Sequence, residues 1–359
     1  MFVRRLSMIV LVVALIGVGA VDAGATKLAG EFFATGLGAR ALGMGGAFGS
    51  VADDASAAYW NPAGLVQPEE SQVLLMHSER FGNLVDYNCF SLARPLSRVG
   101  GEEAAGAISI LWLRVSDIAM TSHLDSAGVD FEDLNGNGVW DPGTERRLWQ
   151  PSRVRWESDN EIAGLLSYAK TVRPNLSVGL NAKVIWKEIA DITCLGFGVD
   201  LGMLYHLTDH LRLGANVQDL TTTPLYWDGW YYTPAQEGGL EKKKVSTKET
   251  IYPTLKLGAS YAVPLSAISG TLLLAGDCDF KFEGLSKEEA DFSFSDVSGD
   301  IRLGASYDYR GLVHVSLGMD RRKPTAGIGL TVNQFGVDYA FWRDTELDNS
   351  HRISVTMDF

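Results

Sequence analysis

The sequence predicts an all-β protein, a transmembrane antiparallel β-barrel of about 14 strands with an N-terminal plug (hatch) in its lumen. Three observations predict this fold: the N-terminus has the order of a secretory signal peptide, alternating apolar and polar segments fill most of the chain, and the last segment ends on an aromatic residue. A secreted chain without a helical span enters a membrane only as a closed barrel, since only that geometry satisfies every backbone polar group without water. We therefore expect the protein in the bacterial outer membrane.

The first 25 residues set the compartment. Arg4 and Arg5 precede the apolar run Met8–Val18, and small residues with plausible cleavage sites at 21–23 or 23–25 follow it. The run has 11 residues, too few for a membrane-spanning helix, which needs roughly 20. Residues 1–25 are therefore predicted to be a signal peptide. A lipid anchor is not expected, because no cysteine follows either cleavage site.

Alternation from about residue 71 onward predicts the strands of a barrel over 69–359. The clearest apolar row is Leu195, Phe197, Val199, Leu201, Met203 and Tyr205. Similar rows occur within 176–186, 313–319, 328–332, 335–341 and 353–359. Each row predicts a lipid-facing side opposite a small or polar lumen side. The mean hydropathy of +0.03 is ordinary for a soluble protein because the two sides of each strand cancel.

The positions of the strands give a check on the barrel. Candidate strands start near residues 71, 84, 104, 159, 175, 194, 209, 251, 269, 299, 312, 325, 335 and 350. With a periplasmic N-terminus, the connections that face outward are 78–83, 117–158, 190–193, 220–250, 282–298, 321–324 and 344–349. The three longest connections belong to this outward set, as expected for extracellular loops.

Composition and repeats agree with a single barrel. The 39 glycines, 12 tyrosines and 9 tryptophans fit a barrel with aromatic girdles, and the net charge of −13 argues against nucleic acid as a partner. Segments 211–217, 255–261 and 301–307 repeat one Leu-Gly-Ala strand pattern at irregular spacing, which excludes a solenoid. Cys89, Cys194 and Cys278 each fall within a predicted strand and have no disulfide-type or metal-type spacing.

Residues 26–68 do not alternate, and their many small side chains allow backbone to pack closely against backbone. This predicts a compact plug. Asp53 or Asp54 is expected to cap a short helix through Trp60, and Asn61-Pro62 to end it. A dinucleotide loop is excluded because GxGxxG is absent. The candidate plug or gate residues are Arg40, Asp53, Asp54, Asn61 and Pro62. Their side chains have two interpretations, a gate or ligand contact and hydrogen bonds that hold the plug to the wall, of which we prefer the second.

The stretch GARALGMGGAFGSVADDASAAYWNPAGL, residues 38–65, resembles the N-terminal signature of the FadL superfamily of outer-membrane proteins, particularly its PorV/PorQ branch. The resemblance implies a barrel of about 14 strands with an N-terminal hatch. For FadL-like members it implies uptake of hydrophobic molecules, such as long-chain fatty acids, through a lumen pocket and a lateral opening. For PorV-like members it implies a role in the type IX secretion system, where exported proteins are delivered to surface attachment.

One outward loop, within 117–158, carries a candidate calcium site. Oxygen-bearing side chains occupy positions 1, 3, 5 and 9 of an EF-hand-like pattern, Gly138 occupies position 6, and Val139 offers its carbonyl. Position 12 is Thr144, so the expected acid comes one residue late. The candidate ligands are Asp133, Asn135, Asn137, Val139, Asp141 and Glu145. The alternative is a solvated acidic turn, since Asn-Gly pairs often make turns. If bound, Ca²⁺ is expected to stiffen the loop.

Enzymatic activity is not expected. The six histidines are scattered, and neither HExxH nor GxSxG occurs. His314 falls on a predicted lumen face, where a hydrogen-bonded structural role is favoured over a hydrolase site. The predicted function is binding or passing hydrophobic substrates across the outer membrane, and the alternative is an interaction or shuttle component of a type IX-like secretion system. The expected partners are outer-membrane lipid, a hydrophobic small molecule or secreted protein cargo, and the barrel-assembly machinery during insertion.

Overall fold

The structure is a computed structural model that describes residues 30, 32–82, 84–99, 102–120, 132–137, 141, 143–146, 155–234, 240–282, 290–294, 297–343 and 349–359. The predicted signal peptide, residues 1–25, lies outside these residues.

The described strands form one antiparallel sheet that closes on itself, because β1 pairs with both β2 and β17. The strands are β1 (Gln72–Arg80), β2 (Val85–Val99), β3 (Glu102–Met120), β4 (Arg155–Arg173), β5 (Leu176–Ile189), β6 (Ile192–His206), β7 (Leu211–Gln218), β8 (Thr223–Pro234), β9 (Leu240–Ile251), β10 (Thr254–Leu265), β11 (Gly270–Lys281), β12 (Phe292–Phe294), β13 (Val297–Tyr309), β14 (Val313–Asp320), β15 (Lys323–Val332), β16 (Phe335–Trp342) and β17 (Ser350–Asp358).

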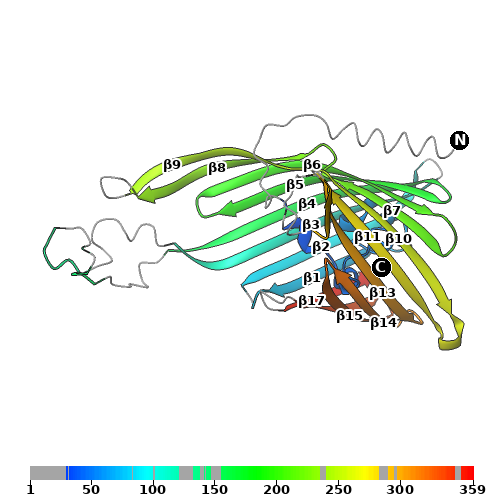
Figure 1. Cartoon of the computed structure of the whole chain (residues 1–359). Coiled ribbons are helices and arrows are strands. Elements are labelled where there is room, and N and C mark those ends of the chain that lie inside the picture. Colours follow the sequence, from blue (N-terminus) through cyan, green and yellow to red (C-terminus); the bar gives the residue numbers. More distant parts are fainter. Residues whose placement is uncertain are drawn as a thin grey trace.

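These elements make a barrel of 14 strands, which confirms the predicted fold class. β7 and β8 follow one another along β6 and form one barrel strand, and β9 and β10 likewise form the next. β12 is a short addition that pairs only with the first residues of β13 among the described strands. Figure 1 shows the tilted strands around the N-terminal segment, which is drawn in blue inside the barrel.

Two of the predicted outward connections are wrong in detail. Residues 220–250 were expected to be a loop, but most of them form the β8–β9 hairpin, which reaches past the neighbouring strands (Figure 1). Residues 282–298 contain the short strand β12. The hairpin was missed because its second strand carries consecutive lysines, Lys242–Lys244, which have the composition of a solvated loop.

The two faces of the wall differ as alternation predicts. On β6 the side chains of Leu195, Phe197 and Leu201 are 43%, 51% and 44% exposed, whereas Cys194 and Asp200 on the opposite face are buried. The same alternation holds along β5, where Asn181 and Lys183 are buried in the lumen. An outer band of apolar side chains is what a lipid-facing wall requires.

The antiparallel order places the C-terminal end of β1 and of every second barrel strand after it at one end of the barrel, here called the long-loop end. The described turns 190–191 and 321–322 lie there. The opposite, short-turn end holds Pro174-Asn175 and the start of β1 beside Phe359.

The N-terminal segment fills part of the lumen with short helices, and we call residues 32–67 the plug. Its elements are the 3₁₀-helices η1 (Phe33–Thr35) and η2 (Pro62–Val66) and the α-helices α2 (Ala39–Gly43) and α3 (Ala57–Trp60). A further 3₁₀-helix, η5 (Ser266–Ile268), connects β10 to β11. In the described part of the chain, every helix is too short to cross a membrane.

Candidate functional site: the plugged lumen

Glycines on the inner wall make room for the plug. A Cβ added at Gly214 would overlap the carbonyl oxygen of Gly49, and one at Gly304 would overlap the carbonyl oxygen of Met44. At Gly258, the Cβ would lie 3.2 Å from the backbone nitrogen of Ser50. These three glycines are the central residues of the Leu-Gly-Ala repeat. The repeat therefore marks the strands against which plug backbone packs. This role was not predicted from the sequence.

Polar side chains of the wall satisfy the plug backbone. The Asp277 carboxylate accepts the backbone N–H groups of Phe48 and Gly49 at 3.0 and 2.7 Å. On β5 and β7, on the same side of the barrel, Asn181 and Asn216 donate to the carbonyl oxygens of Ala58 and Trp60. Because short helices leave many backbone groups unpaired, these wall contacts replace the partners that a longer helix would provide.

Asn61 and Pro62 end α3 as predicted. Asn61 is extended and completely buried, and its side chain accepts the backbone N–H of Ala63, which starts η2 with Pro62 in its first position. The Asn61 amide also donates to the carbonyl oxygens of Gly49 in the plug and Met203 in the wall, at 2.8 and 3.0 Å. The Asn61 side chain thus links the plug to the wall through one hydrogen bond.

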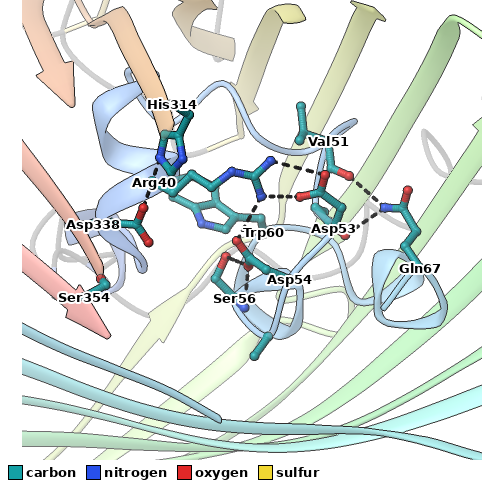
Figure 2. Close-up of polar contacts among 12 residues, drawn as sticks. Arg40, Val51, Asp53, Asp54, Ser56, Trp60, Gln67, His314, Asp338 and Ser354 are labelled. Carbon is teal, nitrogen blue, oxygen red and sulfur yellow. Dashed lines mark hydrogen bonds and ion pairs between the residues drawn. The ribbon is translucent and has the colours of Figure 1, made fainter. Parts of the chain in front are cut away.

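Arg40, Asp53 and Asp54 form a network within the plug, in contrast to the expected contacts with the wall. Arg40 lies 2.6 Å from Asp53 and 3.4 Å from Asp54. Figure 2 shows the Arg40 guanidinium between the two carboxylates. Asp54 accepts the Ser56 backbone N–H at 2.8 Å, so it fixes the turn before α3 without capping the helix directly. The network joins α2 to the loop before α3.

The two carboxyl groups of this network differ in their pKa. Burial raises the pKa of Asp54 above its ordinary value, and the nearby charge of Asp53 adds to this rise. Burial acts in the same direction on Asp53, but the charge and hydrogen bonds of Arg40 outweigh it and lower the pKa of Asp53. Asp53 is therefore the main counter-ion of Arg40.

Lumen ion pairs surround the plug and contact its aromatic residues. Lys183 pairs with Asp200 at 2.8 Å and with Asp219 at 2.6 Å, and its ammonium lies 5.0 Å from the ring centre of Phe33. Lys187 is at the same distance from the Phe32 ring. Such distances are within the range of cation–π attraction. The first turn of the plug is held by cation–π contacts to the wall.

His314 lies on the lumen face, as predicted, and pairs with Asp338 at 3.0 Å (Figure 2). The negative charge of Asp338 also acts on the Arg40 guanidinium. The structure thus gives His314 a carboxylate partner in the lumen, and its structural role stays a prediction.

A cavity of about 310 Å³ lies between the start of the plug and the long-loop end of the wall. Its apolar lining consists of Phe32, Ala34, Phe81, Leu113 and Trp342. Its polar lining consists of Thr35, Arg80, Glu161, Asp320, Arg321 and Arg352. Phe32, Ala34 and Thr35 come from the plug, so a movement of the plug would change the shape of the cavity. This site could not be predicted from the sequence, because it is assembled from residues far apart in the chain.

The candidate calcium loop is only partly described. The Asp141 carboxylate accepts hydrogen bonds from the side chains of Asn135 and Asn137, and Glu145 accepts the backbone N–H of Asp141 at 2.9 Å. Asp133 accepts the backbone N–H of Gly136. Val139 lies outside the described residues.

No group of three or more His, Cys, Asp or Glu residues is placed to hold a metal ion within the ranges that the structure describes. The predicted calcium set relies on asparagine and carbonyl oxygens besides its acids, so calcium binding stays a prediction.

Neither a family model nor a curated protein matches the sequence. Solved structures do match. The P. putida toluene transporter TodX has a TM-score of 0.57 at 13% identity, with 90% of this chain and 99% of that chain covered. The CymD monoaromatic hydrocarbon channel has a TM-score of 0.56 at 16% identity, covering 90% and 98%. A P. aeruginosa FadL homologue has a TM-score of 0.53 at 12% identity, covering 89% and 98%.

The chain has the FadL/TodX-like fold. This confirms the coarser part of the predicted resemblance. The PorV/PorQ branch stays a prediction, as do the roles of the candidate plug and gate residues.

Proposed function

We propose that the protein is an outer-membrane channel that binds hydrophobic small molecules in its lumen and passes them across the outer membrane. The single observation that carries the proposal is the cavity beside the plug, because aromatic and aliphatic side chains form much of its lining. The fold is shared with a toluene transporter and a monoaromatic hydrocarbon channel, which supports the same class of substrate. We also propose that the protein is not an enzyme.

The proposed mechanism has three steps: binding in the cavity, displacement of the plug, and lateral release through the wall. Binding in the cavity would act directly on the plug, because the first plug residues line the cavity. These residues are Phe32, Ala34 and Thr35. Displacement requires breaking contacts that are individually modest, such as the Asn61 and Asp277 hydrogen bonds and the Lys183 contact with Phe33.

A cavity-filling variant tests this proposal. Ala34→Trp places an indole in the cavity without changing a strand, and Ala182→Trp adds the same side chain on the lipid-facing side of β5. Toluene binding to the purified full chain is measured by its displacement of a fluorescent apolar probe. We expect Ala34→Trp to lose toluene binding and Ala182→Trp to keep it. Equal binding by both variants would contradict the proposed site.

The second candidate function is a shuttle in a type IX-like secretion system. The observation that favours it is the β8–β9 hairpin, whose side chains Tyr226, Trp230 and Tyr231 are exposed. Exposed aromatic residues are enriched at protein interfaces. Replacing the three by serine should remove a stoichiometric cargo protein from the purified complex, as measured by native mass spectrometry. If the wild-type protein carries an apolar ligand and no cargo, this candidate is rejected.

A further inference from the structure

The cavity beside the plug is cationic as well as apolar. Its lining carries three arginines, Arg80, Arg321 and Arg352, against two carboxylates, Glu161 and Asp320. Both carboxylates already face cations outside this lining. Glu161 pairs with Lys187 at 3.1 Å, and Asp320 pairs with Arg302 at 3.0 Å. Arg321 in turn has carboxylate partners, Asp320 at 3.7 Å and Asp300 at 4.0 Å. The positive charge that a ligand in this cavity could offset is therefore that of Arg352.

Arg352 gives the strongest indication of the ligand. Arg352 is 4% exposed, and its guanidinium lies 5.2 Å from the ring centre of Trp342. Among the described residues, Arg352 has neither an ion pair nor a hydrogen bond, and its buried Nε lacks a partner. A buried guanidinium without a counter-ion is costly, because burial removes its hydration. An anion in the cavity would offset this cost.

The neighbouring strand positions add further unsatisfied polar groups. The Trp342 Nε1, the Tyr87 hydroxyl and the Ser350 hydroxyl are buried and have no hydrogen-bond partner in the described part of the chain. In the strand register, Trp342 is opposite Ser350, while Ser78 is opposite both Arg352 and Tyr87. Each of these groups is able to donate a hydrogen bond. Of these residues, Trp342 lines the cavity, and its unpaired N–H is an independent indication of an acceptor-bearing ligand or its ordered water there.

We propose that this cavity binds a small aromatic acid in its carboxylate form, with the carboxylate on Arg352 and the ring against Phe32 and Phe81. The inference rests on the proposed channel function and names the class of substrate. A planar guanidinium holds a carboxylate through two parallel hydrogen bonds, and aromatic side chains pack on the ring.

The size of the cavity limits the ligand. A volume of 310 Å³ is close to that of about ten water molecules, which suits an acid with one aromatic ring. A long acyl chain would not be contained by it. The site would therefore select ligands by their negative charge, through Arg352, and by their length, through the limited volume of the cavity.

The test compares benzoate with benzyl alcohol, which has nearly the same shape and no charge. Both are titrated into the detergent-solubilised full chain at pH 7 by calorimetry. The variants are Arg352→Met, which removes the charge, and Arg173→Met, which removes an exposed arginine at the short-turn end. We expect Arg352→Met to weaken benzoate binding at least tenfold and to change benzyl alcohol binding by less than twofold. Arg173→Met is expected to change neither.

Ala34→Trp provides a second test that leaves Arg352 and the strands intact, in case Arg352→Met fails to fold. It should abolish binding of both ligands. Equal affinity of the wild-type protein for benzoate and benzyl alcohol, or unchanged benzoate binding in Arg352→Met, would overturn the inference. In that case, toluene binding that is lost in Ala34→Trp would leave the channel function standing. If the wild-type protein also fails to bind toluene, both the channel function and the aromatic-acid site are rejected.

Discussion

Glycines on the inner wall decide at the scale of single atoms whether the plug fits. Gly214 on β7 faces the carbonyl oxygen of Gly49 so closely that one added carbon atom would overlap it. Backbone on both sides of this contact leaves no flexible side chain to move away. We predict that Gly214→Ala destabilises the seated plug by about 1–3 kcal/mol, as for other overpacked sites. Hydrogen exchange of the plug amides measures the change.

Gly164 on β4 is the matched control for this substitution, because an added Cβ there meets no atom within 4 Å. Gly164→Ala should therefore leave plug exchange unchanged. If both variants exchange like the wild-type protein, close backbone packing does not hold the plug in place.

Asp53 and Asp54 are neighbours in sequence but should respond oppositely to loss of charge. Asp53→Asn removes the main counter-ion of Arg40, and we expect it to weaken the seated plug by about 1–2 kcal/mol. Asp54→Asn keeps an oxygen that accepts the Ser56 N–H and removes a buried charge, so it should be neutral or slightly stabilising. Hydrogen exchange of α2 and α3 distinguishes them. A similar loss in both variants would contradict the assignment of Asp53 as the counter-ion.

The same pair sets the pH dependence of the plug. The pKa of Asp54 is raised, so protonation on moderate acidification removes an unfavourable buried charge and should tighten the plug. The pKa of Asp53 is lowered from its ordinary 3.8, so its contribution is complete above that pH and is lost as the pH falls through the lower folded value. As the pH is lowered, conductance in planar bilayers should therefore first fall as Asp54 is protonated above its ordinary pKa of 3.8, and rise only below about 3.8, where Asp53 begins to lose its charge.

At the scale of elements, alternation predicted the barrel strands well. The expected starts near 175, 269 and 335 compare with observed starts at Leu176, Gly270 and Phe335. These strands are predictable because one face meets lipid and the other meets the lumen, so every residue carries the signal. The β8–β9 hairpin was not predictable in this way. Beyond the barrel, its strands have no lipid-facing side to impose alternation.

Contacts across the lumen could not be predicted from the sequence. The pairing of Lys183 with Asp219 depends on the register of separate strands and on the turn after β7. The Arg352 cavity likewise combines the plug with residues from six separate strands. In contrast, the end of α3 at Trp60 was predictable because Asn61-Pro62 act locally.

Calcium binding by the loop between β3 and β4 is a prediction from local sequence alone. If its oxygens bind Ca²⁺, Asp133→Asn together with Asp141→Asn should weaken terbium or calcium binding at least tenfold, because both charges would be lost. Luminescence of bound terbium measures the effect. Asp209→Asn, in an exposed turn at the short-turn end, should have no effect. Calcium affinity that is equal in the loop variant and the wild-type protein would leave the solvated acidic turn as the correct interpretation.

At the scale of the whole molecule, the plug and the barrel form a system with two states if the channel function is correct. The plug begins at the cavity near the long-loop end and leaves the lumen at the short-turn end, where β1 starts. A substrate therefore contacts the first residues of the plug, while the last residues are held by the covalent connection to β1. Movement is thus expected at residues 32–49 in preference to Pro62–Val66, which lies next to that covalent connection.

A cross-link between the plug and the wall separates movement from simple passage. The Ala39 backbone N–H donates to the Ser354 hydroxyl at 2.8 Å, so cysteines at these two positions bring their sulfur atoms close. In a background without Cys89, Cys194 and Cys278, the oxidised double variant should lose uptake of an apolar substrate into proteoliposomes, and reductant should restore it. Ala39→Cys alone should transport in both redox states. Full uptake by the oxidised form would mean that substrates pass a stationary plug, and the lumen would then act as a fixed pore whose selectivity is set by the cavity lining alone.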